Sequence, residues 1–419
     1  MGTSLAYFLG SRFEGNIAVV EREDEVARHA SGRNTGVIHR PFYLHPQQRR
    51  LFARTASLSY PFWKEYAFLK GLPWAETGTL KVALSEDKIK SLEKNMEYAK
   101  ANGMDPSELE LLDSRETARM EPEVRCVGAL LIKTDTTCDF GSFTLSLRQD
   151  AESMGVRFIT RREVVGVDER GGDCALTTAL NKEKISTHLT VNCAGGNAID
   201  VAHLFGLAGE YADMHFRGEY WAIDERAAGL AGRNIYCVPR QDEFPFLDPH
   251  WIVRVDGRRE IGPNAVPVPG PTIYNGMVRY GPKWATDLLQ PPIWNKLCVW
   301  MNRDFVSMSM FEMWSSLSKN EMLRRVAQFI PKLKLEHVKA KGTAGVRSMV
   351  LDRKGRFSKE AIELEGQNSF HILNFNSPGA TGAPAYSAHI VRRMEEDGLL
   401  DHLKERQRPQ GIWDWDKAV

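Results

Sequence analysis

Apolar residues recur at three- and four-residue spacing along several stretches of the chain, as they do in helices that bury one face. This spacing predicts helices over residues 51–70, 86–102 and 140–154, and a similar helix-like stretch at the beginning of the chain predicts a helix over residues 2–12. Short β-branched or alternating runs are typical of strands. They predict strands over residues 16–21, 78–84, 156–160, 189–193 and 371–376. Helices and strands that alternate in this way indicate the α/β fold class.

The stretch from about residue 211 to residue 331 has a different character. Aromatic residues, prolines and short alternating runs, such as residues 219–223 and 251–255, predict an antiparallel sheet there. Helix–strand units that suit a nucleotide lie at both ends and in the middle of the chain. We therefore predict one discontinuous domain into which a second domain is inserted. The predicted ranges are 1–70, 139–210 and 340–419 for the first domain, and 71–138 and 211–339 for the second.

The first 21 residues have the order of the second half of a nucleotide-binding β-α-β unit: a helix, an apolar strand and then an acid, Glu21. An acid at this place accepts hydrogen bonds from ribose hydroxyls. Gly2, followed four residues later by Ala6, fits only the third glycine of a G-x-G-x-x-G loop, so we expect either an earlier gene start or a truncated chain. A helix and a strand packed for structural reasons alone is the competing interpretation.

Two more glycine-bearing turns follow predicted strands. One contains Ala194 and Gly195, and the other is the SPGATG segment at residues 377–382. Backbone N–H groups at such turns point at one spot, where the helix dipole stabilises a pyrophosphate or the negative charge of a reduced flavin. Residues 30–39 add a loop whose small and polar side chains suit a large planar ligand. Ordinary helix caps and a solvated loop are the competing interpretations.

Composition narrows the class of protein. Fifty-five Lys and Arg against 54 Asp and Glu leave a net charge of +1, which removes the electrostatic argument for nucleic-acid binding. No stretch reaches the roughly 20 apolar residues of a membrane helix. The six cysteines are dispersed and lack metal-ligand spacing, which argues against zinc and against a disulfide framework. We expect a cytoplasmic protein without a metal site, and peripheral contact with a membrane is left open.

The motifs resemble those of the glycine/D-amino-acid oxidase superfamily of FAD-dependent oxidoreductases. Within it, the chain is most similar to the L-2-hydroxyglutarate oxidase/dehydrogenase family, over almost its whole length. The motifs that carry the resemblance are NIAVVERE, SGRNTGVIH, ETGTLKVAL, LDSRETARMEP, VNCAGG, FRGEYW, FPFLDPHWIVRVDGRREIGPNAV, GTAGVRSM and NSPGATGAPA. The FRGEYW and IGPNAV motifs are the most family-specific of these.

The resemblance implies a Rossmann-like FAD-binding domain for the discontinuous ranges and a substrate domain, built on a mixed or antiparallel sheet, for the inserted ranges. It also implies that FAD is the cofactor. The residues that it assigns to FAD are Gly2 and Glu21 at the ADP half, Ser31, Arg33 and Asn34 at the pyrophosphate and flavin, Ala194 and Gly195 at the adenosine side, and Gly379, Ala380 and Thr381 at the isoalloxazine.

Four further residues are candidates for the chemistry. His39 follows the flavin-side loop and is the candidate base, since an unperturbed imidazole titrates near working pH. Arg347 lies where the superfamily often places an arginine that binds the substrate carboxylate with two parallel hydrogen bonds. Arg217 and Tyr220, in FRGEYW, are weaker candidates. Loop packing, a structural ion pair and sheet packing are the respective competing interpretations.

The chain also departs from the family pattern. Arg40, Pro41 and Phe42 follow His39 where small residues are usual, and Ser348 and Met349 follow Arg347. Arg40 adds a second anion contact or narrows the pocket. Both possibilities leave the substrate open.

The resemblance implies oxidation of an L-2-hydroxy acid, L-2-hydroxyglutarate or a similar one, to the 2-oxo acid by hydride transfer to flavin N5. The electron acceptor is then oxygen or a quinone. Two alternatives stay open at this stage: an amine or glycerol-3-phosphate oxidase of the same superfamily, and a non-catalytic partner subunit without FAD.

Overall fold

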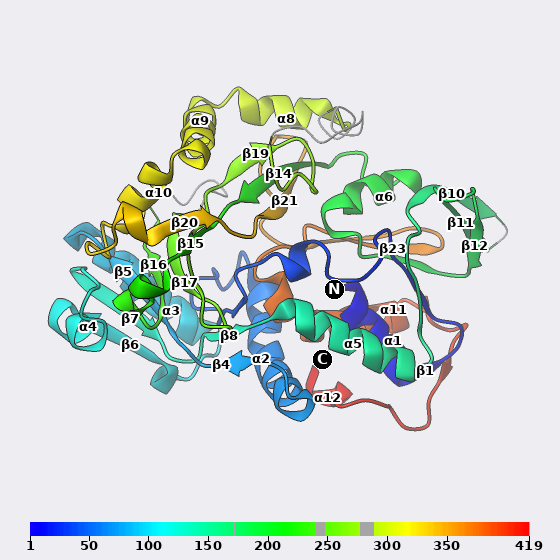
Figure 1. Ribbon diagram of the computed structural model, residues 1–419. Helices are drawn as coiled ribbons and strands as arrows, with labels where there is room; N and C mark the ends of the chain where they lie inside the picture. The colour runs from blue at the N-terminus through cyan, green and yellow to red at the C-terminus, as the bar shows by residue number, and fades with distance from the viewer. Residues whose placement is uncertain (171, 240–247, 277–288, 419) are drawn as a thin grey trace.

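The computed structural model describes residues 1–170, 172–239, 248–276 and 289–418 (Figure 1). Part of the FPFLDPHW motif, residues 244–247, and parts of the predicted inserted domain, residues 240–247 and 277–288, lie outside the described residues. The longer helices are α1 (Gly2–Arg12), α2 (Arg50–Lys70), α3 (Ile89–Ala101), α5 (Phe140–Ser153), α8 (Ile293–Trp300), α9 (Arg303–Leu317), α10 (Lys319–Val326) and α11 (Gly379–Glu396). Short helices are α4 (Ser114–Met120), α6 (Ala198–Leu204) and α12 (Trp415–Ala418).

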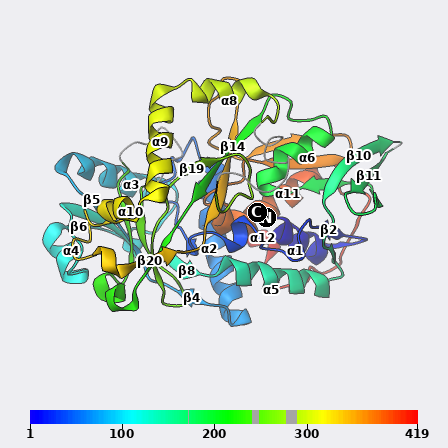
Figure 2. The same cartoon turned by 45° about the horizontal axis from the view of Figure 1, so that its top comes forward.

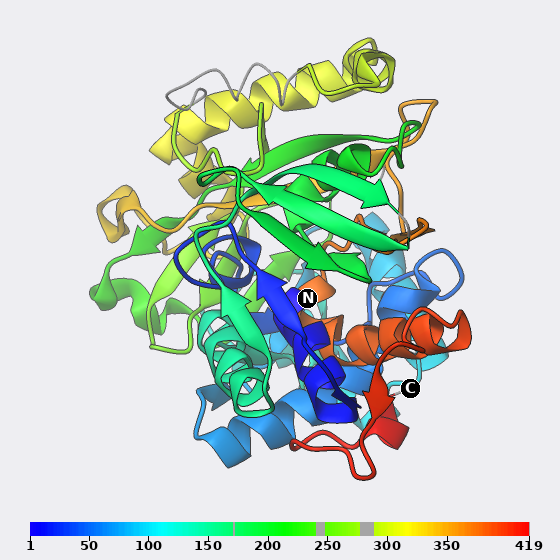
Figure 3. The same cartoon turned by 90° about the vertical axis from the view of Figure 1, so that its right-hand side faces the viewer.

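Parallel strand pairs join distant parts of the chain. Strand β2 (Ala18–Val20) pairs in parallel with β9 (Arg157–Ile159), and β13 (Thr190–Asn192) pairs in parallel with β23 (Ser369–Leu373). Strand β22 (Ile362–Glu365) completes the second sheet on the other side of β23. Figure 3 shows the resulting arrangement, in which the blue N-terminal segment and the orange-to-red C-terminal segment lie next to each other.

Helix α11 packs against both α1 and α2 in an apolar core that all three helices share. Gly382 allows the closest approach, because a β-carbon there would lie 2.8 Å from Oγ1 of Thr55 on α2. The indole Nε1 of Trp63 donates to the carbonyl of Thr381 at 2.9 Å. Ser4 of α1 donates to a carbonyl of α11 at 3.3 Å. These contacts fix the first turn of α11 relative to the other two helices.

A mixed eight-stranded sheet forms the left-hand part of Figure 1. Strands β5 and β16 pair in parallel and the other neighbours are antiparallel. In spatial order the strands are β20 (Val338–Lys341), β15 (Trp221–Ile223), β18 (Arg259–Gly262), β17 (His250–Val253), β16 (Asn234–Cys237), β5 (Thr79–Ala83), β7 (Gly128–Ile132) and β6 (Leu109–Asp113). Its core is apolar and centres on the fully buried Trp251.

Smaller sheets complete the structure. One has the order β19 (Val266–Val268), β14 (Ala212–Gly218), β21 (Gly345–Leu351). Another has the order β3 (Val37–Ile38), β8 (Thr136–Cys138), β4 (Trp74–Ala75). At the far right of Figure 1 lie β10 (Val164–Arg170), β11 (Asp173–Thr178) and β12 (Lys184–Thr187). None of the described helices is both long enough and apolar enough to cross a membrane.

The predicted antiparallel sheet over residues 211–331 is wrong for its last third. Helices α8, α9 and α10 occupy that stretch, and Figure 2 shows α8 along the top of the molecule and α9 running down from it towards α10. The sequence did not indicate a helix here because α9 buries polar side chains and exposes apolar ones, the reverse of the usual pattern. Ser309, Glu312 and Ser315 are buried, whereas Met310, Trp314 and Leu317 are 67%, 53% and 86% exposed.

Candidate active site

A single large cavity collects residues from the whole length of the chain. Its volume is about 1920 Å³, roughly twice the upper limit of about 1,000 Å³ for ordinary small-molecule sites. Of the fourteen residues that the sequence singled out, thirteen line it. They are Gly2, Glu21, Ser31, Arg33, Asn34, His39, Ala194, Gly195, Tyr220, Arg347, Gly379, Ala380 and Thr381.

One group of lining residues lies at the N-terminus of α1 and at the end of β2. Gly2 begins α1, whose N-cap makes no side-chain hydrogen bond, and Glu21 follows directly after β2. The carboxylate Oε1 of Glu21 accepts the backbone N–H of Glu23 at 2.8 Å. An uncapped helix N-terminus attracts a phosphate, and the nearby carboxylate can accept from hydroxyl groups.

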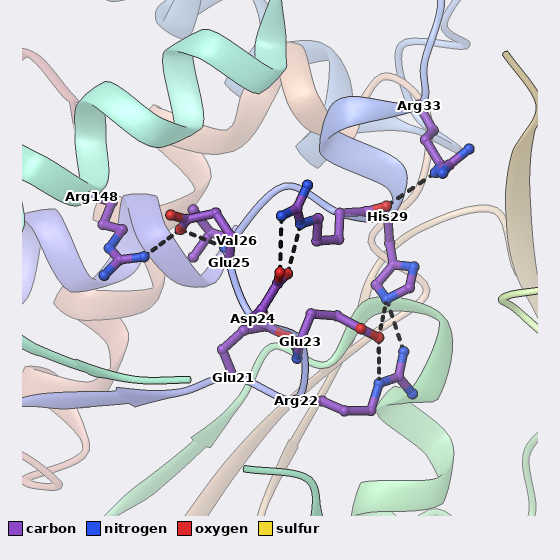
Figure 4. A network of polar contacts seen from close by, with 10 residues as sticks. Glu21, Arg22, Glu23, Asp24, Glu25, Val26, His29, Arg33 and Arg148 are labelled. Atoms are coloured by element: carbon purple, nitrogen blue, oxygen red, sulfur yellow. Dashed lines mark hydrogen bonds and ion pairs between the residues drawn. The ribbon is translucent and has the colours of Figure 1, made fainter. Parts of the chain in front are cut away.

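A polar network holds the loop that follows Glu21 (Figure 4). Arg22 Nε donates to Oε1 of Glu23 at 3.0 Å, and His29 Nε2 lies 2.8 Å from the same oxygen. Burial raises the pKa of Glu23, but these contacts outweigh burial and leave it below its usual value. Arg33 Nε donates to the carbonyl of Arg28 at 3.1 Å. The network therefore fixes the 21–33 segment at the cavity wall.

The second helix N-terminus in the cavity belongs to α11. Gly379, Ala380 and Thr381 form its first turn, and its N-cap, Pro378, makes no side-chain capping hydrogen bond. Thr381 Oγ1 accepts the backbone N–H of His39 at 3.2 Å, which ties this turn to the candidate base. The dipole of α11 thus stabilises negative charge close to His39.

His39 is held by a buried carboxylate. Antiparallel pairing of β3 with β8 sets Ile38 opposite Thr136, so His39 and Asp135, the next residues outward, face each other. His39 Nδ1 lies 2.9 Å from Oδ2 of Asp135, whose side chain is fully buried. Because a carboxylate only accepts, Nδ1 carries the hydrogen, so in the neutral form of the ring the lone pair is on Nε2.

The lone pair of His39 Nε2 faces a tyrosine hydroxyl. Tyr236 of β16 places its hydroxyl 3.2 Å from Nε2. Burial raises the pKa of Tyr236 well above its usual value, so this hydroxyl keeps its proton and donates. The ring of Tyr236 packs on that of His250, with 3.8 Å between centroids. Burial lowers the pKa of His250, which is therefore neutral at physiological pH.

Arg347 lies on β21 opposite Phe216 of β14 and lines the cavity. Burial lowers the pKa of its guanidinium, although the group stays charged. None of the described residues forms an ion pair with Arg347. A desolvated cation without a counter-ion in a cavity is suited to bind an anionic ligand.

Arg217 is not among the described lining residues. It forms a buried ion pair with Glu219 at 3.1 Å and donates to the carbonyls of Ile273 and Gly276. These contacts fit a structural role within the sheet, the alternative given for Arg217, better than a contact with the substrate. Tyr220 lines the cavity, and burial raises its pKa to about 12.

Arg40 also lies outside the cavity lining, so its two expected roles there are not seen. Its guanidinium forms an ion pair with Glu108 at 2.9 Å and packs over the ring of Tyr60. Its backbone N–H instead serves the site, because it donates to Oδ1 of Asp135 at 2.7 Å.

Four residues of the site were missed from the sequence: Asp135, Tyr236, Tyr43 and Arg49. All but Asp135 line the cavity directly. Tyr43 and Arg49 lie within ten residues of His39, and this proximity was the available signal. Asp135 and Tyr236 reach His39 through strand pairing, which no local pattern reveals.

The cavity fits FAD. Two helix N-termini without side-chain caps, a carboxylate after a parallel strand and small residues at both turns line one space large enough for a dinucleotide and a substrate. At Gly345, a β-carbon would lie 2.1 Å from the carbonyl oxygen of Arg33. The wall of the cavity is therefore closed by a contact that only glycine permits. Such a site defines a dinucleotide-dependent oxidoreductase of the flavin type.

The chain belongs to the DAO family, FAD-dependent oxidoreductases, whose model matches residues 1–393. It is therefore an FAD-dependent oxidoreductase, and the predicted fold class, enzyme class and cofactor are confirmed. The chain is 29% identical to the mitochondrial L-2-hydroxyglutarate dehydrogenase of Mus musculus, over 91% of this chain and 83% of that one. It is 26% identical to L-2-hydroxyglutarate dehydrogenase of Salmonella houtenae, over 91% of this chain and 87% of the relative.

Solved structures share the fold. L-α-glycerophosphate oxidase from Mycoplasma pneumoniae with FAD bound has a TM-score of 0.76 at 21% identity, and the match covers 98% of this chain and 95% of that one. Glycine oxidase from Geobacillus kaustophilus has a TM-score of 0.68 at 15% identity, over 94% and 92% of the two chains.

Proposed function

We propose that the protein oxidises an L-2-hydroxy acid to the 2-oxo acid, with L-2-hydroxyglutarate as the first candidate. The names of the relatives that match over most of their length support this substrate. The observation that carries the proposal is the meeting of His39, Arg347 and the first turn of α11 in one cavity. A base, a carboxylate-binding cation and a site for negative charge are what this oxidation requires.

FAD, when bound, accepts the hydride that leaves the carbon bearing the hydroxyl group. Gly2 and Glu21 would hold its ADP half, with Ala194 and Gly195 on the adenosine side. The residues assigned to its pyrophosphate and flavin are Ser31, Arg33, Asn34, Gly379, Ala380 and Thr381. All of these residues line the cavity, which supports the assignment.

His39 takes the proton of the substrate hydroxyl on Nε2. Asp135 holds Nδ1–H at 2.9 Å and stabilises the imidazolium that forms. Tyr236 donates to the same Nε2, so the substrate hydroxyl must displace or share this contact. The tyrosine then orients the ring until substrate arrives.

Arg347 binds the carboxylate beside the reacting carbon. Its planar guanidinium can make two parallel hydrogen bonds, which orient the substrate as well as bind it. A lysine at this position would keep the charge and lose the orientation.

Rapid anaerobic mixing of FAD-loaded protein with L-2-hydroxyglutarate tests the proposal. We expect the flavin absorbance to bleach, the D-enantiomer to leave it unchanged, and Arg347→Lys to raise KM about 10-fold or more, the cost of one hydrogen bond to a charged group. No bleaching at millimolar substrate contradicts the proposal. Sarcosine, glycine, D-amino acids and glycerol 3-phosphate in the same assay test the amine and glycerol-3-phosphate oxidase alternatives.

A further inference from the structure

A second arginine, Arg49, lines the cavity that contains His39 and Arg347. It is the N-cap residue of α2 and makes no side-chain capping hydrogen bond. Its Nη2 donates to the carbonyl of Ser377 at 2.9 Å, and its guanidinium lies 4.8 Å from the ring of Phe52. The side chain is thus held beside the loop that leads into α11.

The guanidinium of Arg49 is poorly satisfied. Its Nε is buried and makes no hydrogen bond, and no described residue forms an ion pair with it. Burial lowers its pKa, so the protein holds this cation at a cost in desolvation. A buried donor without a partner in a cavity wall points to a ligand that supplies the acceptor.

Glu360 is the nearest competing explanation, since its charge acts on Arg49. Its Oε1 instead accepts the backbone N–H of Leu51 at 3.1 Å. Burial also raises the pKa of Glu360, which weakens it as a counter-charge. Glu360 therefore does not neutralise Arg49 as a direct ion pair would.

Tyr43 connects Arg49 with the candidate base and with Arg347. Its ring meets that of His39 edge to face, with 6.1 Å between centroids. Burial raises the pKa of Tyr43, and the charges of Arg49 and Arg347 both oppose that rise. One hydroxyl group is therefore within electrostatic reach of both guanidinium groups.

The two cations also act on each other. Burial contributes most to the lowered pKa of Arg347, and the charge of Arg49 lowers it further. An anionic ligand with one negative group would relieve this repulsion only in part. A ligand with a negative group at each end would satisfy both guanidinium groups.

We propose that Arg49 forms a second carboxylate-binding subsite, which makes the cavity selective for dicarboxylic acids. Arg347 binds the carboxylate beside the reacting carbon, and Arg49 binds the distal carboxylate. Tyr43 lies near both and donates to the bound acid. Which carboxylate binds to which arginine rests on the proposed function. The binding of a dicarboxylic acid by Arg49 and Arg347 together does not depend on turnover.

Two non-reacting acids test the subsite without catalysis. Glutarate has two carboxylates and butyrate has one, and both are titrated into FAD-loaded protein while the flavin absorbance and the melting temperature are followed. The variants are Arg49→Leu and Arg49→Lys. Arg50→Leu is the matched control, because Arg50 is the exposed neighbour on the first turn of α2.

We expect the unmodified protein to bind glutarate more tightly than butyrate. Arg49→Leu should weaken glutarate about 10- to 100-fold, the effect of losing hydrogen bonds to a charged group, and leave butyrate within about 2-fold. Arg49→Lys should recover part of the glutarate affinity, and Arg50→Leu should change neither acid. Equal loss for both acids, or no loss for either, overturns the proposal.

Turnover separates this proposal from the proposed function. L-2-hydroxyglutarate and L-2-hydroxybutyrate are compared by kcat/KM in the same variants. Bleaching by neither acid contradicts the proposed function, while the glutarate and butyrate titrations still decide the subsite. If both acids bleach the flavin and Arg49→Leu does not reduce the preference in kcat/KM for L-2-hydroxyglutarate, only the proposed subsite is contradicted.

Discussion

His39 Nδ1 and the fully buried carboxylate of Asp135 lie 2.9 Å apart, and the two residues directly flank the paired strands β3 and β8, almost a hundred residues apart in the chain. This contact fixes which nitrogen of the imidazole carries its hydrogen. It also sets the ring plane relative to the first turn of α11, whose Thr381 accepts from the backbone of His39. The chemistry of the site therefore depends on the pairing of β3 with β8.

Replacing Asp135 by asparagine should slow flavin reduction. An amide can donate to Nδ1, which favours the tautomer with hydrogen on Nε2 and removes the base. We expect the rate of flavin bleaching to fall on the order of 10²- to 10⁴-fold, the usual contribution of a general base. Asp87→Asn is the control, because Asp87 is an exposed carboxylate on a surface turn. An unchanged rate in Asp135→Asn would contradict the assignment of His39 as the base.

Glu21→Gln should weaken FAD without disturbing the turn after β2. The amide oxygen of glutamine can still accept from the backbone of Glu23, but the negative charge is lost. Hydrogen bonds to charged groups contribute about 1.5–3 kcal/mol, so the Kd for FAD should rise about 10- to 100-fold. Fluorescence quenching of FAD measures this. Glu14→Gln, at an exposed ion pair with Lys404, should leave the Kd unchanged; equal weakening in both variants would contradict the assignment.

Gly345→Ala should move the cofactor loop. The new β-carbon would lie 2.1 Å from the carbonyl oxygen of Arg33, a distance that backbone shifts must relieve. Overpacking of this kind costs about 1–3 kcal/mol, and FAD affinity should fall with it. Urea unfolding and FAD titration measure the two effects. Gly209→Ala is the control, because a β-carbon there meets open space; retention of FAD affinity in Gly345→Ala is the contrary result.

His371 should make the protein less stable in mild acid. It is fully buried on β23, and burial lowers its pKa to about 4, against about 6.5 for the unfolded chain. Below pH 6.5 the unfolded chain binds a proton that the folded protein does not, so the free energy of unfolding falls as pH drops towards 4. The slope for one such group is at most about 1.4 kcal/mol per pH unit.

Urea unfolding at pH 7 and pH 5, for the unmodified protein and His371→Asn, checks this contribution. We expect the variant to lose less of its free energy of unfolding between the two pH values. A pH dependence identical in both proteins would show that other groups dominate.

Local patterns predicted the elements that form the cofactor site. Helix α1 has the predicted bounds, and a helix is present at the SPGATG segment as predicted, although α11 begins inside that segment, at Gly379. The strand predicted over residues 371–376 instead ends at Leu373, because Asn374 adopts a left-handed conformation with φ of 58°. Asparagine adopts this conformation more readily than most residues, but the HILNFN sequence does not show that the first of its two asparagines ends the strand.

Long-range contacts explain what the sequence could not reveal. Arg40 and Arg49 are both cations near His39, yet Arg40 pairs with Glu108, in the short turn that precedes β6, and Arg49 faces the cavity. Similarly, Asp135 becomes a partner of His39 only through the register of β3 and β8. Residue type and spacing do not distinguish these outcomes, because each depends on which segments meet in three dimensions.

The lining of the cavity runs from Met1 to Leu403 and includes the first turns of α1 and α11, two helices that pack against each other. Binding of FAD therefore stabilises only those conformations in which both ends of the chain are folded against the rest of the protein. At a free FAD concentration a thousand times its Kd, this linkage adds about 4 kcal/mol to the free energy of unfolding. Loss of FAD should consequently increase local unfolding at both termini together. The rate of proteolysis near either end of the chain would then measure how much of the protein lacks FAD.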